Sequence, residues 1–231
     1  MSSIVDEYRR IQDQIVEAAE RAGRDPREVR LVAVSKFHPV EAIAELARVG
    51  HLDFGENYVQ EALDKQEALR EFDLRWHFIG APQTNKAKYM VGRFHLIHSL
   101  DSIKLARELD KRCSHKAVSQ PVLIQVNLGG EGHKAGVAPE GLQSLVEEVL
   151  SRTWLELQGL MCMPPLSEDV SSQPFFARLR EISRDTQRKF GVELPHLSMG
   201  MSHDFEEAIE EGATLIRIGT RIFGQRPRKL G

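Results

Sequence analysis

Residues 31 to 55, LVAVSKFHPVEAIAELARVGHLDFG, contain a complete unit of strand, helix and strand. The run 31–35 is short, apolar and rich in valine, which is typical of a buried strand. A helical pattern follows over 39–49, opened by a proline and closed by a glycine. The run 52–55 then predicts a second strand. Because a helix separates the two strands, we expect them to pair in parallel as a βαβ unit.

The same unit repeats along the rest of the chain. Six further β-rich runs lie at 75–80, 95–99, 122–127, 156–161, 196–199 and 214–219, and helical patterns lie at 57–69, 84–91, 101–113, 139–151, 173–189 and 203–211. Eight strands that alternate with helices favour an α/β fold of the (β/α)8 TIM barrel type. An open doubly wound sheet is the alternative.

An additional amphipathic helix is predicted before the first strand, with Ile4, Tyr8, Ile11 and Ile15 on its apolar face. No linker, low-complexity tract or internal repeat interrupts the series of strands and helices. We therefore expect residues 1–231 to form a single domain.

The composition narrows the class of protein. Thirty-one Lys and Arg stand against 34 Asp and Glu, and a formal net charge of -3 gives no general attraction to nucleic acid or to an anionic membrane. No apolar run approaches the ~18 residues that a membrane span requires. The two cysteines, Cys113 and Cys162, show no spacing typical of a metal site or a disulfide framework. We expect a soluble, reduced, cytoplasmic protein, and a monomer.

In a TIM barrel, functional residues collect where the strands end, and phosphate often binds beside the last two strands. Lys36 directly follows the first predicted strand. One interpretation is a lysine that extends its ammonium to water past the strand end. The other is an amine in a partly dry site, where desolvation lowers its pKa and lets it form an imine with an aldehyde. Position alone leaves both open.

Two segments near the C-terminus offer anion-binding groups. In LSMGMSHDF at 197–205, Ser202 is predicted to be the N-cap of the helix 203–211, after a tight turn at Gly200. A helix start with free N–H groups and a hydroxyl suits a phosphate, although ordinary capping is the commoner role.

The second segment is IRIGTRIFG at 216–224, in which Arg217 lies between two isoleucines of a strand. A buried guanidinium needs an acceptor, so Arg217 faces either a ligand or a carboxylate in an internal salt bridge. Gly219 and Thr220 follow and offer further N–H groups and a second hydroxyl next to the Ser202 loop. Both interpretations of Arg217 remain open at this point.

Other motifs are rejected. The glycine-rich stretch 129–135 follows a strand, but Gly136 and Pro139 delay the next helix, so it is not a dinucleotide fingerprint. His95 and His98 are three residues apart in a strand, where they point to opposite faces and cannot readily chelate one metal ion.

Taken together, the motifs resemble one family, the pyridoxal phosphate homeostasis proteins, a single-domain relative of the alanine racemase barrel. They are VSK at 34–36, FGENY at 54–58, WHFIG at 76–80, QxNK at 83–86, QVN at 125–127, KxG at 134–136, GLM at 159–161, LSMGMSxDF at 197–205 and RIGTxIFG at 217–224. The match keeps its order from about residue 31 to residue 226. One departure is the pair Ala81 and Pro82, where the family commonly has histidine and an aliphatic residue.

The resemblance implies a barrel that carries pyridoxal 5′-phosphate as a covalent imine on Lys36. It places Asn57 near the cofactor ring and Arg217 opposite the pyridine nitrogen. It also implies ring-wall and phosphate contacts from Met199, Ser202, Gly219 and Thr220. The pair Ala81 and Pro82 leaves the shape of the third βα loop open.

The resemblance also implies a function. A guanidinium donates hydrogen bonds, so the ring nitrogen stays unprotonated and the cofactor is a weaker electron sink. Racemisation needs a base on each face of the substrate carbon, and Lys36 supplies one. In two-domain alanine racemases a tyrosine from an additional β domain supplies the other, whereas this chain stops about where the barrel closes; Tyr58 is a possible substitute.

The favoured hypothesis is therefore a non-enzymatic protein that stores or delivers pyridoxal phosphate, with apo-enzymes as recipients, and so affects vitamin B6 and the balance of amino and keto acids. The alternative is a pyridoxal-phosphate-dependent amino-acid racemase of weak or narrow activity.

Overall fold

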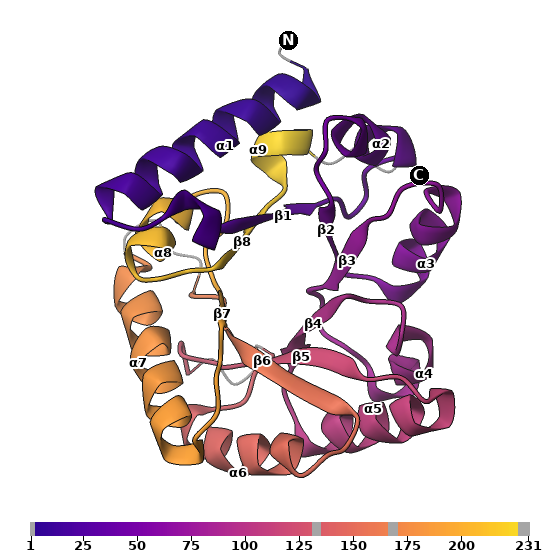
Figure 1. The fold of residues 1–231 in the computed structure, drawn as a ribbon, viewed down its shortest axis with the longest axis vertical. Helices are drawn as coiled ribbons and strands as arrows, with labels where there is room; N and C mark the ends of the chain where they lie inside the picture. Colours follow the sequence, from indigo (N-terminus) through magenta and orange to yellow (C-terminus); the bar gives the residue numbers. More distant parts are fainter. Residues whose placement is uncertain (1–2, 131–134, 166–170, 226–231) are drawn as a thin grey trace.

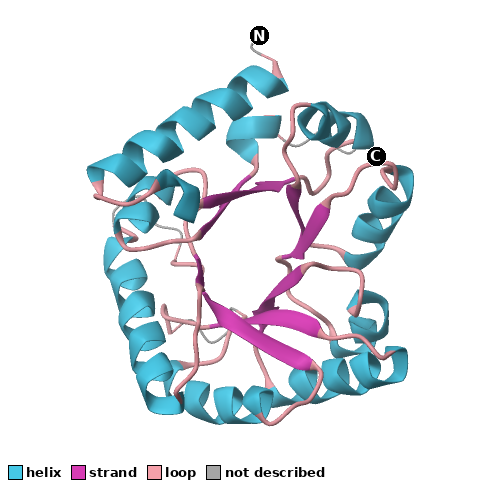
Figure 2. Cartoon of the chain, in the orientation of Figure 1, coloured by secondary structure: helices cyan, strands magenta, loops and turns pink. Residues whose placement is uncertain are grey.

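The computed structural model describes residues 3–130, 135–165 and 171–225. Eight parallel strands follow one another in chain order around a closed barrel, and helices surround it (Figures 1 and 2). The strands are β1 Arg30–Val34, β2 Asp53–Glu56, β3 Arg75–Phe78, β4 Leu96–Leu100, β5 Gln120–Gln125, β6 Leu155–Met161, β7 His196–Ser198 and β8 Leu215–Ile218. The predicted (β/α)8 barrel is confirmed, and the pairing of β8 with β1 excludes an open sheet.

The described helices agree with the predicted ones to within a few residues. They are α1 Ile4–Arg21, α2 Val40–Arg48, α3 Val59–Ala68, α4 Ala87–Met90, α5 Ile103–Lys116, α6 Pro139–Leu150, α7 Gln173–Phe190, α8 Phe205–Glu210 and α9 Thr220–Phe223. Short 3-10 turns lie at η1 Pro26–Glu28 and η2 Thr84–Lys86. The sequence pattern gave no sign of α9, because a single turn is too short to show a helical period.

The additional N-terminal helix is present and covers one side of the barrel. Helix α1 begins at a capping box in which Ser3 accepts from the N–H of Asp6 and the Asp6 carboxylate accepts in return. It packs against α2, α8 and α9, and it buries Ile11 and Ile15 against them (Figure 1). Helix α1 thereby closes the outer layer where β8 meets β1.

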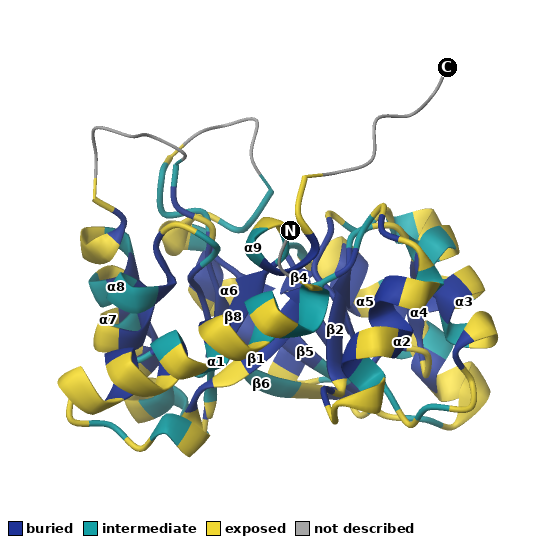
Figure 3. Ribbon diagram, turned by 90° about the horizontal axis from the view of Figure 1, so that it is seen from above, coloured by how far each residue is buried: buried dark blue, intermediate teal, exposed yellow. Residues whose placement is uncertain are grey.

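The core has two layers because side chains alternate along each strand. One face of each strand packs on the helices in a large apolar cluster that includes Phe54, Ile97 and Ile216. The other face points into the barrel, where a smaller cluster holds Val32, Leu96, Leu123, Met161 and Leu215. Figure 3 shows the buried strands at the centre and the exposed residues on the outer faces of the helices.

One local prediction is wrong. Ser202 is not an N-cap: α8 begins at Phe205, its N-cap is Asp204, and residues 202–204 form a turn. The Asp204 carboxylate accepts from the N–H of Met201, which draws the chain into this turn before the helix can start.

Some predictions extend beyond the described residues. The single domain over 1–231 stays a prediction, and part of the rejected glycine-rich stretch 129–135 lies outside the described ranges. Within those ranges, no helix has the length and apolar character needed to cross a membrane.

Candidate functional site

A cavity of about 380 Å³ opens at the carboxyl ends of β1, β2 and β8. This is a volume typical of small-molecule sites. It is lined by Val34, Lys36, Asn57, Ile79, Met163, Met201, Ser202, His203, Arg217, Gly219 and Thr220. Six of the seven predicted site residues therefore share one cavity, although they come from distant parts of the sequence.

Lys36 reaches the cavity because of strand alternation. It lies two residues after Val34, the end of β1, and so continues the face of the strand that points into the barrel. Ser35, between them, points the opposite way and is fully buried. A lysine can follow this buried strand directly because the cavity begins where the strand ends.

A group of buried polar residues lies directly behind this turn. We call Ser35, Glu56, Glu61 and Lys65 the lysine-side cluster. The Lys65 ammonium donates to the Ser35 carbonyl, to Glu56 Oε1 and to Glu61 Oε1, each at 2.7 Å. The Ser35 hydroxyl also donates to Glu56 Oε1 at 2.7 Å. One cation on α3 thereby joins the end of β1 to β2.

The lysine-side cluster also fixes the backbone after Lys36. Phe37 has φ 66°, a left-handed conformation that is uncommon for a bulky residue. Its N–H donates to Glu61 Oε1 at 2.5 Å. The N–H of His38 donates to the Ser35 carbonyl at 3.0 Å. The peptide groups on both sides of Lys36 are therefore held by hydrogen bonds, and the sharp turn between them directs the lysine side chain into the cavity.

Burial of this cluster has an electrostatic cost. Burial raises the pKa of the Glu56 carboxyl above its ordinary value, against the opposing effects of Lys65 and Ser35. Within the described chain, Glu56 Oε2 is a buried oxygen without a hydrogen-bond partner. The cluster thus keeps a strained turn in place with a carboxylate that is only half satisfied.

Arg217 forms the floor of the cavity and is 4% exposed. It donates to the Ser198 hydroxyl at 2.6 Å and to the Cys162 carbonyl at 3.0 Å. Burial lowers the pKa of Arg217 from its ordinary value, and no salt bridge to it occurs within the described residues. The internal ion pair considered for Arg217 is therefore not formed there. A guanidinium has five N–H donors, so three have no partner among the described residues of the chain, and the side chain lines the cavity.

The Ser202 turn forms one edge of the cavity and is held from both sides. Gly200 has φ 90°, and a Cβ there would lie 2.6 Å from the Cβ of Ala208, so a larger residue does not fit. The Asp204 carboxylate accepts from Met201 N–H at 2.6 Å and from the Ser172 hydroxyl at 2.9 Å. Arg221 of α9 donates to the Ser202 carbonyl at 3.3 Å.

The start of α9 forms the adjoining edge. A Cβ at Gly219 would lie 3.0 Å from the carbonyl oxygen of Val34, so the glycine lets β8 and β1 approach closely at the cavity. Thr220, the first residue of α9, lines the same wall. Ser202 and Thr220 therefore line the same cavity; their role in phosphate binding stays a prediction.

Asn57 contributes an unusual polar atom. Its Oδ1 is buried and has no hydrogen-bond partner in the described part of the chain. The Asn57 backbone is held against Gly80, where a Cβ would lie 2.1 Å from the Asn57 carbonyl oxygen. An unpaired buried oxygen in a cavity wall is an acceptor available to a ligand.

The structure does not bring Met199 to the cavity. Met199 is fully buried and belongs to the apolar cluster between strands and helices. The reason is alternation: Ser198 points into the barrel, so its neighbour points outward. The wall instead contains Ile79, Met163 and Met201, which the sequence analysis missed. A signal was present for Ile79, which lies two residues after His77 on the same face of β3.

A second cavity of about 480 Å³ lies next to the first and shares Asn57 with it. Its lining includes Tyr58, Ala81, Gln83, Lys86 and Tyr89. Ala81, half of the departure from the family pattern, therefore faces the neighbouring cavity and not the cavity of Lys36.

The comparisons with known proteins agree with this geometry. The model of the family described as alanine racemase, N-terminal domain, matches residues 7–227. A pyridoxal phosphate homeostasis protein of Aquifex aeolicus is 51% identical, covering 94% of this chain and 96% of its own. One of Pseudomonas aeruginosa is 45% identical, covering 98% and 97%. The chain belongs to the family of pyridoxal phosphate homeostasis proteins.

A solved structure of a family member extends the comparison to three dimensions. PipY of Synechococcus elongatus, whose structure has PLP bound, is 39% identical with a TM-score of 0.81, covering 91% of this chain and 100% of that one. The family membership predicted from the motifs is confirmed. In this chain, the residues that the structure describes contain no cluster of three or more His, Cys, Asp or Glu side chains that could hold a metal ion.

Proposed function

We propose that the chain binds pyridoxal 5′-phosphate in the cavity of Lys36 and acts in the homeostasis of this cofactor as a carrier, not an enzyme. The observation that carries the proposal is the convergence of Lys36, Arg217 and the hydroxyls of Ser202 and Thr220 on one cavity. These are an amine, a guanidinium and an anion-binding edge, which an aromatic aldehyde phosphate requires together. The proposal treats residues 1–231 as one domain built around this cavity.

The residues present fit the cofactor. The unpaired Asn57 Oδ1 and the three remaining Arg217 donors are polar groups that a ligand would satisfy. Gly219 keeps the wall beside Thr220 free of a side chain. When bound, pyridoxal phosphate supplies an aldehyde that condenses with a lysine amine, with loss of water.

The chain's own residues then have distinct roles. Lys36 attaches the cofactor through its amine, and the turn at Phe37 fixes the direction of that amine. Ser202, Gly219 and Thr220 bind the phosphate through hydroxyl and N–H groups. Arg217 would donate a hydrogen bond to the pyridine nitrogen and would so keep a proton off it.

The carrier role is proposed because these residues are poorly suited to the proton transfers that racemisation requires. A guanidinium can only donate, so Arg217 would keep the ring nitrogen as an acceptor, which would weaken the cofactor as an electron sink. Racemisation needs a second acid or base facing Lys36. The nearest tyrosine, Tyr58, is 52% exposed, lines the neighbouring cavity and packs against the Phe37 ring at 5.2 Å between centroids. Tyr58 is therefore poorly placed to be this second base, which favours storage and delivery over a racemisation that uses a tyrosine.

The site is tested by borohydride reduction and peptide mapping. Reduction of the loaded protein is expected to fix the cofactor to the peptide that contains Lys36. The Lys36→Ala variant should lose both the visible absorbance band and the label, while Lys104→Ala, on the exposed face of α5, keeps them. A label that persists on Lys36→Ala would overturn the assignment.

The role is tested with the loaded wild-type protein. We expect it to restore activity to apo-enzymes that require pyridoxal phosphate, and to give neither D-isomer nor keto acid from any L-amino acid. Sustained turnover of one amino acid would favour the racemase, and Tyr58→Phe would then show whether Tyr58 is its second base. Failure of transfer would remove delivery from the proposal.

Two further parts of the proposal concern the state of the protein in the cell. A reduced, cytoplasmic protein agrees with two free, buried cysteines, whose thiol pKa values burial raises to about 12. A monomer is expected because one chain supplies every residue that we assign to the site. Light scattering of the loaded protein measures this directly.

A further inference from the structure

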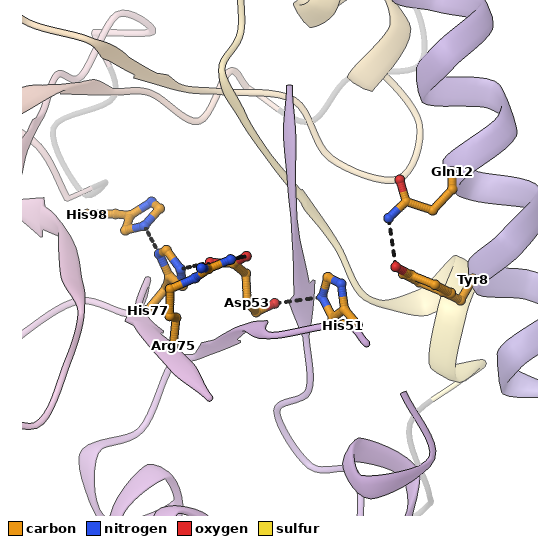
Figure 4. A network of polar contacts seen from close by, with 7 residues as sticks. All are labelled: Tyr8, Gln12, His51, Asp53, Arg75, His77 and His98. Atoms are coloured by element: carbon orange, nitrogen blue, oxygen red, sulfur yellow. Dashed lines mark hydrogen bonds and ion pairs between the residues drawn. The ribbon is translucent and has the colours of Figure 1, made fainter. Parts of the chain in front are cut away.

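A continuous line of hydrogen bonds runs through the barrel interior behind Arg217. Arg217 Nη1 lies 2.6 Å from Ser198 Oγ, which lies 2.8 Å from His98 Nδ1. His98 Nε2 lies 2.9 Å from His77 Nδ1, and His77 Nε2 lies 3.0 Å from Asp53 Oδ1. We call these five residues the histidine chain. Figure 4 shows the part of the histidine chain that is most distant from Arg217 along the line of hydrogen bonds, from His98 to Asp53.

The histidine chain joins three neighbouring strands, β2 to β4, to the neighbouring strands β7 and β8. Asp53 is on β2, His77 on β3, His98 on β4 and Ser198 on β7, and all four are at most 4% exposed. Such side chains stand where most TIM barrels have branched apolar residues. The role proposed above for Arg217 does not require them, so their presence calls for a separate explanation.

The direction of every hydrogen bond follows from the two ends of the chain. Burial opposes the charge of Asp53, but hydrogen bonds from His77 and Arg75 outweigh it and keep the Asp53 pKa below its usual range. Asp53 therefore accepts, and His77 donates from Nε2. Burial lowers the pKa of both histidines, so each ring carries one proton.

The remaining protons are then determined. His77 Nδ1 has no proton and accepts from His98 Nε2–H. His98 Nδ1 in turn accepts from the Ser198 hydroxyl, whose oxygen accepts from Arg217. The opposite direction would require a cationic His77, and it would leave the Ser198 hydroxyl proton without an acceptor among the contacts of the described chain. Only the first arrangement gives a partner to each ring nitrogen of His77 and His98 and to the Ser198 hydroxyl.

We propose that His98 and His77 are positioning residues for Arg217: they orient the Ser198 hydroxyl so that its oxygen faces the guanidinium, and they connect Arg217 to the Asp53 carboxylate. Each donor in the line polarises the next, so the negative end favours the cation at the cavity. The inference rests on the proposed function, because it gives Arg217 a ligand to face. The ligand class is a phosphorylated aromatic aldehyde, and Arg217 faces its neutral ring nitrogen.

The first test needs neither a variant nor the cofactor. In ¹⁵N NMR spectra of the wild-type protein with labelled histidine at neutral pH, His77 and His98 should both be neutral and carry the proton on Nε2. A cationic His77, or a proton on Nδ1 of either ring, would overturn the direction of the chain.

The second test measures cofactor affinity and the visible spectrum in a double-mutant cycle. Ser198→Ala should weaken pyridoxal phosphate binding about tenfold, the usual effect of losing a hydrogen bond to a charged group. His98→Phe should weaken it by a similar factor and shift the band in the same direction. The double variant should lose no more than either single one, because both changes cut the same line.

Two variants serve as controls. Ser198→Thr keeps the hydroxyl and should bind within about threefold of wild type. His51→Phe alters a buried histidine that contacts the Asp53 backbone carbonyl, outside the histidine chain (Figure 4), so affinity per folded molecule should not change. If His98→Phe left affinity and spectrum unchanged, or if its effect added to that of Ser198→Ala, positioning through the chain would be wrong. If the wild type itself bound no pyridoxal phosphate, the proposed function would fail instead.

Discussion

The cavity is supported by two polar assemblies that differ in almost every physical respect. The lysine-side cluster lies between the barrel wall and α3, and one ammonium and two carboxylates meet there within a few ångströms. The histidine chain lies inside the barrel and spans it from β2 to β8 through side chains that are neutral between its two ends. Among the described residues, the first leaves the Glu56 Oε2 atom without a hydrogen-bond partner, whereas the second pairs every ring nitrogen of its two histidines.

The difference shows two ways of placing a functional group. A compact charged cluster can hold a backbone in an unfavourable conformation, because several strong hydrogen bonds converge on a few peptide groups. A neutral chain cannot supply that force, but it transfers orientation across the barrel without burying additional charge. Lys36 needs the first kind of support because its direction depends on a backbone turn. Arg217, in the middle of a regular strand, needs only the second.

The largest expected effect comes from breaking the charged cluster. Lys65→Met removes the one cation and leaves the buried Glu56 carboxylate without a counter-ion, so the free energy of unfolding should fall by about 3–5 kcal/mol. Urea unfolding measures this, with Lys104→Met as an exposed control that should change by less than about 0.5 kcal/mol.

The partner variant makes this test specific. In Glu56→Gln/Lys65→Met the buried carboxylate is gone, so the double variant should recover part of the loss. A loss below about 1 kcal/mol for Lys65→Met would mean that the cluster is solvated and does not carry the turn.

The two assemblies should also differ, by a smaller amount, in how their contribution to the free energy of unfolding depends on pH. Asp53 and Glu56 are both on β2, but hydrogen bonds overcome burial and lower the pKa of Asp53, whereas burial raises the pKa of Glu56. A lowered carboxyl pKa stabilises the fold above the unfolded value of 3.8, and this stability is lost as pH falls. A raised one has the opposite sign: its contribution is largest below 4.5 and is lost as pH rises through the folded pKa.

The measurement is the difference in unfolding free energy between wild type and each amide variant across acidic pH. For Asp53→Asn the advantage of the wild type should grow as pH rises from acid past 3.8. For Glu56→Gln it should shrink as pH rises above 4.5. Slopes of the same sign would show that the two carboxylates are not in the different environments described above.

The same contrast explains what the sequence could predict. The barrel could be predicted because strand and helix periods, with proline and glycine at the boundaries, are local signals. Lys36, Ser202 and Arg217 could be predicted as site residues because functional residues of a TIM barrel lie at the strand ends. The place of Ser202 relative to α8 could not be predicted, because the side chain of Asp204 decides where that helix starts.

Neither assembly could be predicted, for different reasons. The histidine chain depends on which strands face each other across the closed barrel, and Ser198 and His98 are 100 residues apart. The spacing of His95 and His98 in one strand gives no sign that the hydrogen-bond partner of His98 is His77 on the neighbouring strand. The lysine-side cluster holds Phe37 in a left-handed conformation, which no residue preference at that position indicates.

The smallest expected effect is the most direct test of the backbone turn itself. Glycine normally costs up to about 1 kcal/mol relative to alanine, but at a left-handed position alanine carries the steric penalty, so Phe37→Gly should be about 1 kcal/mol more stable than Phe37→Ala. Val49, which is exposed with φ −94°, is the matched control, and there the alanine variant should be the more stable one.

The comparison becomes decisive when it is repeated without the cluster. In the Lys65→Met background the chain around Lys36 can relax, so the advantage of Phe37→Gly over Phe37→Ala should shrink toward zero. An advantage that stayed constant would mean that residues other than the lysine-side cluster impose the turn. Equal stability of the two variants in the wild-type background would mean that the turn stores no strain, and the direction of Lys36 would then need another cause.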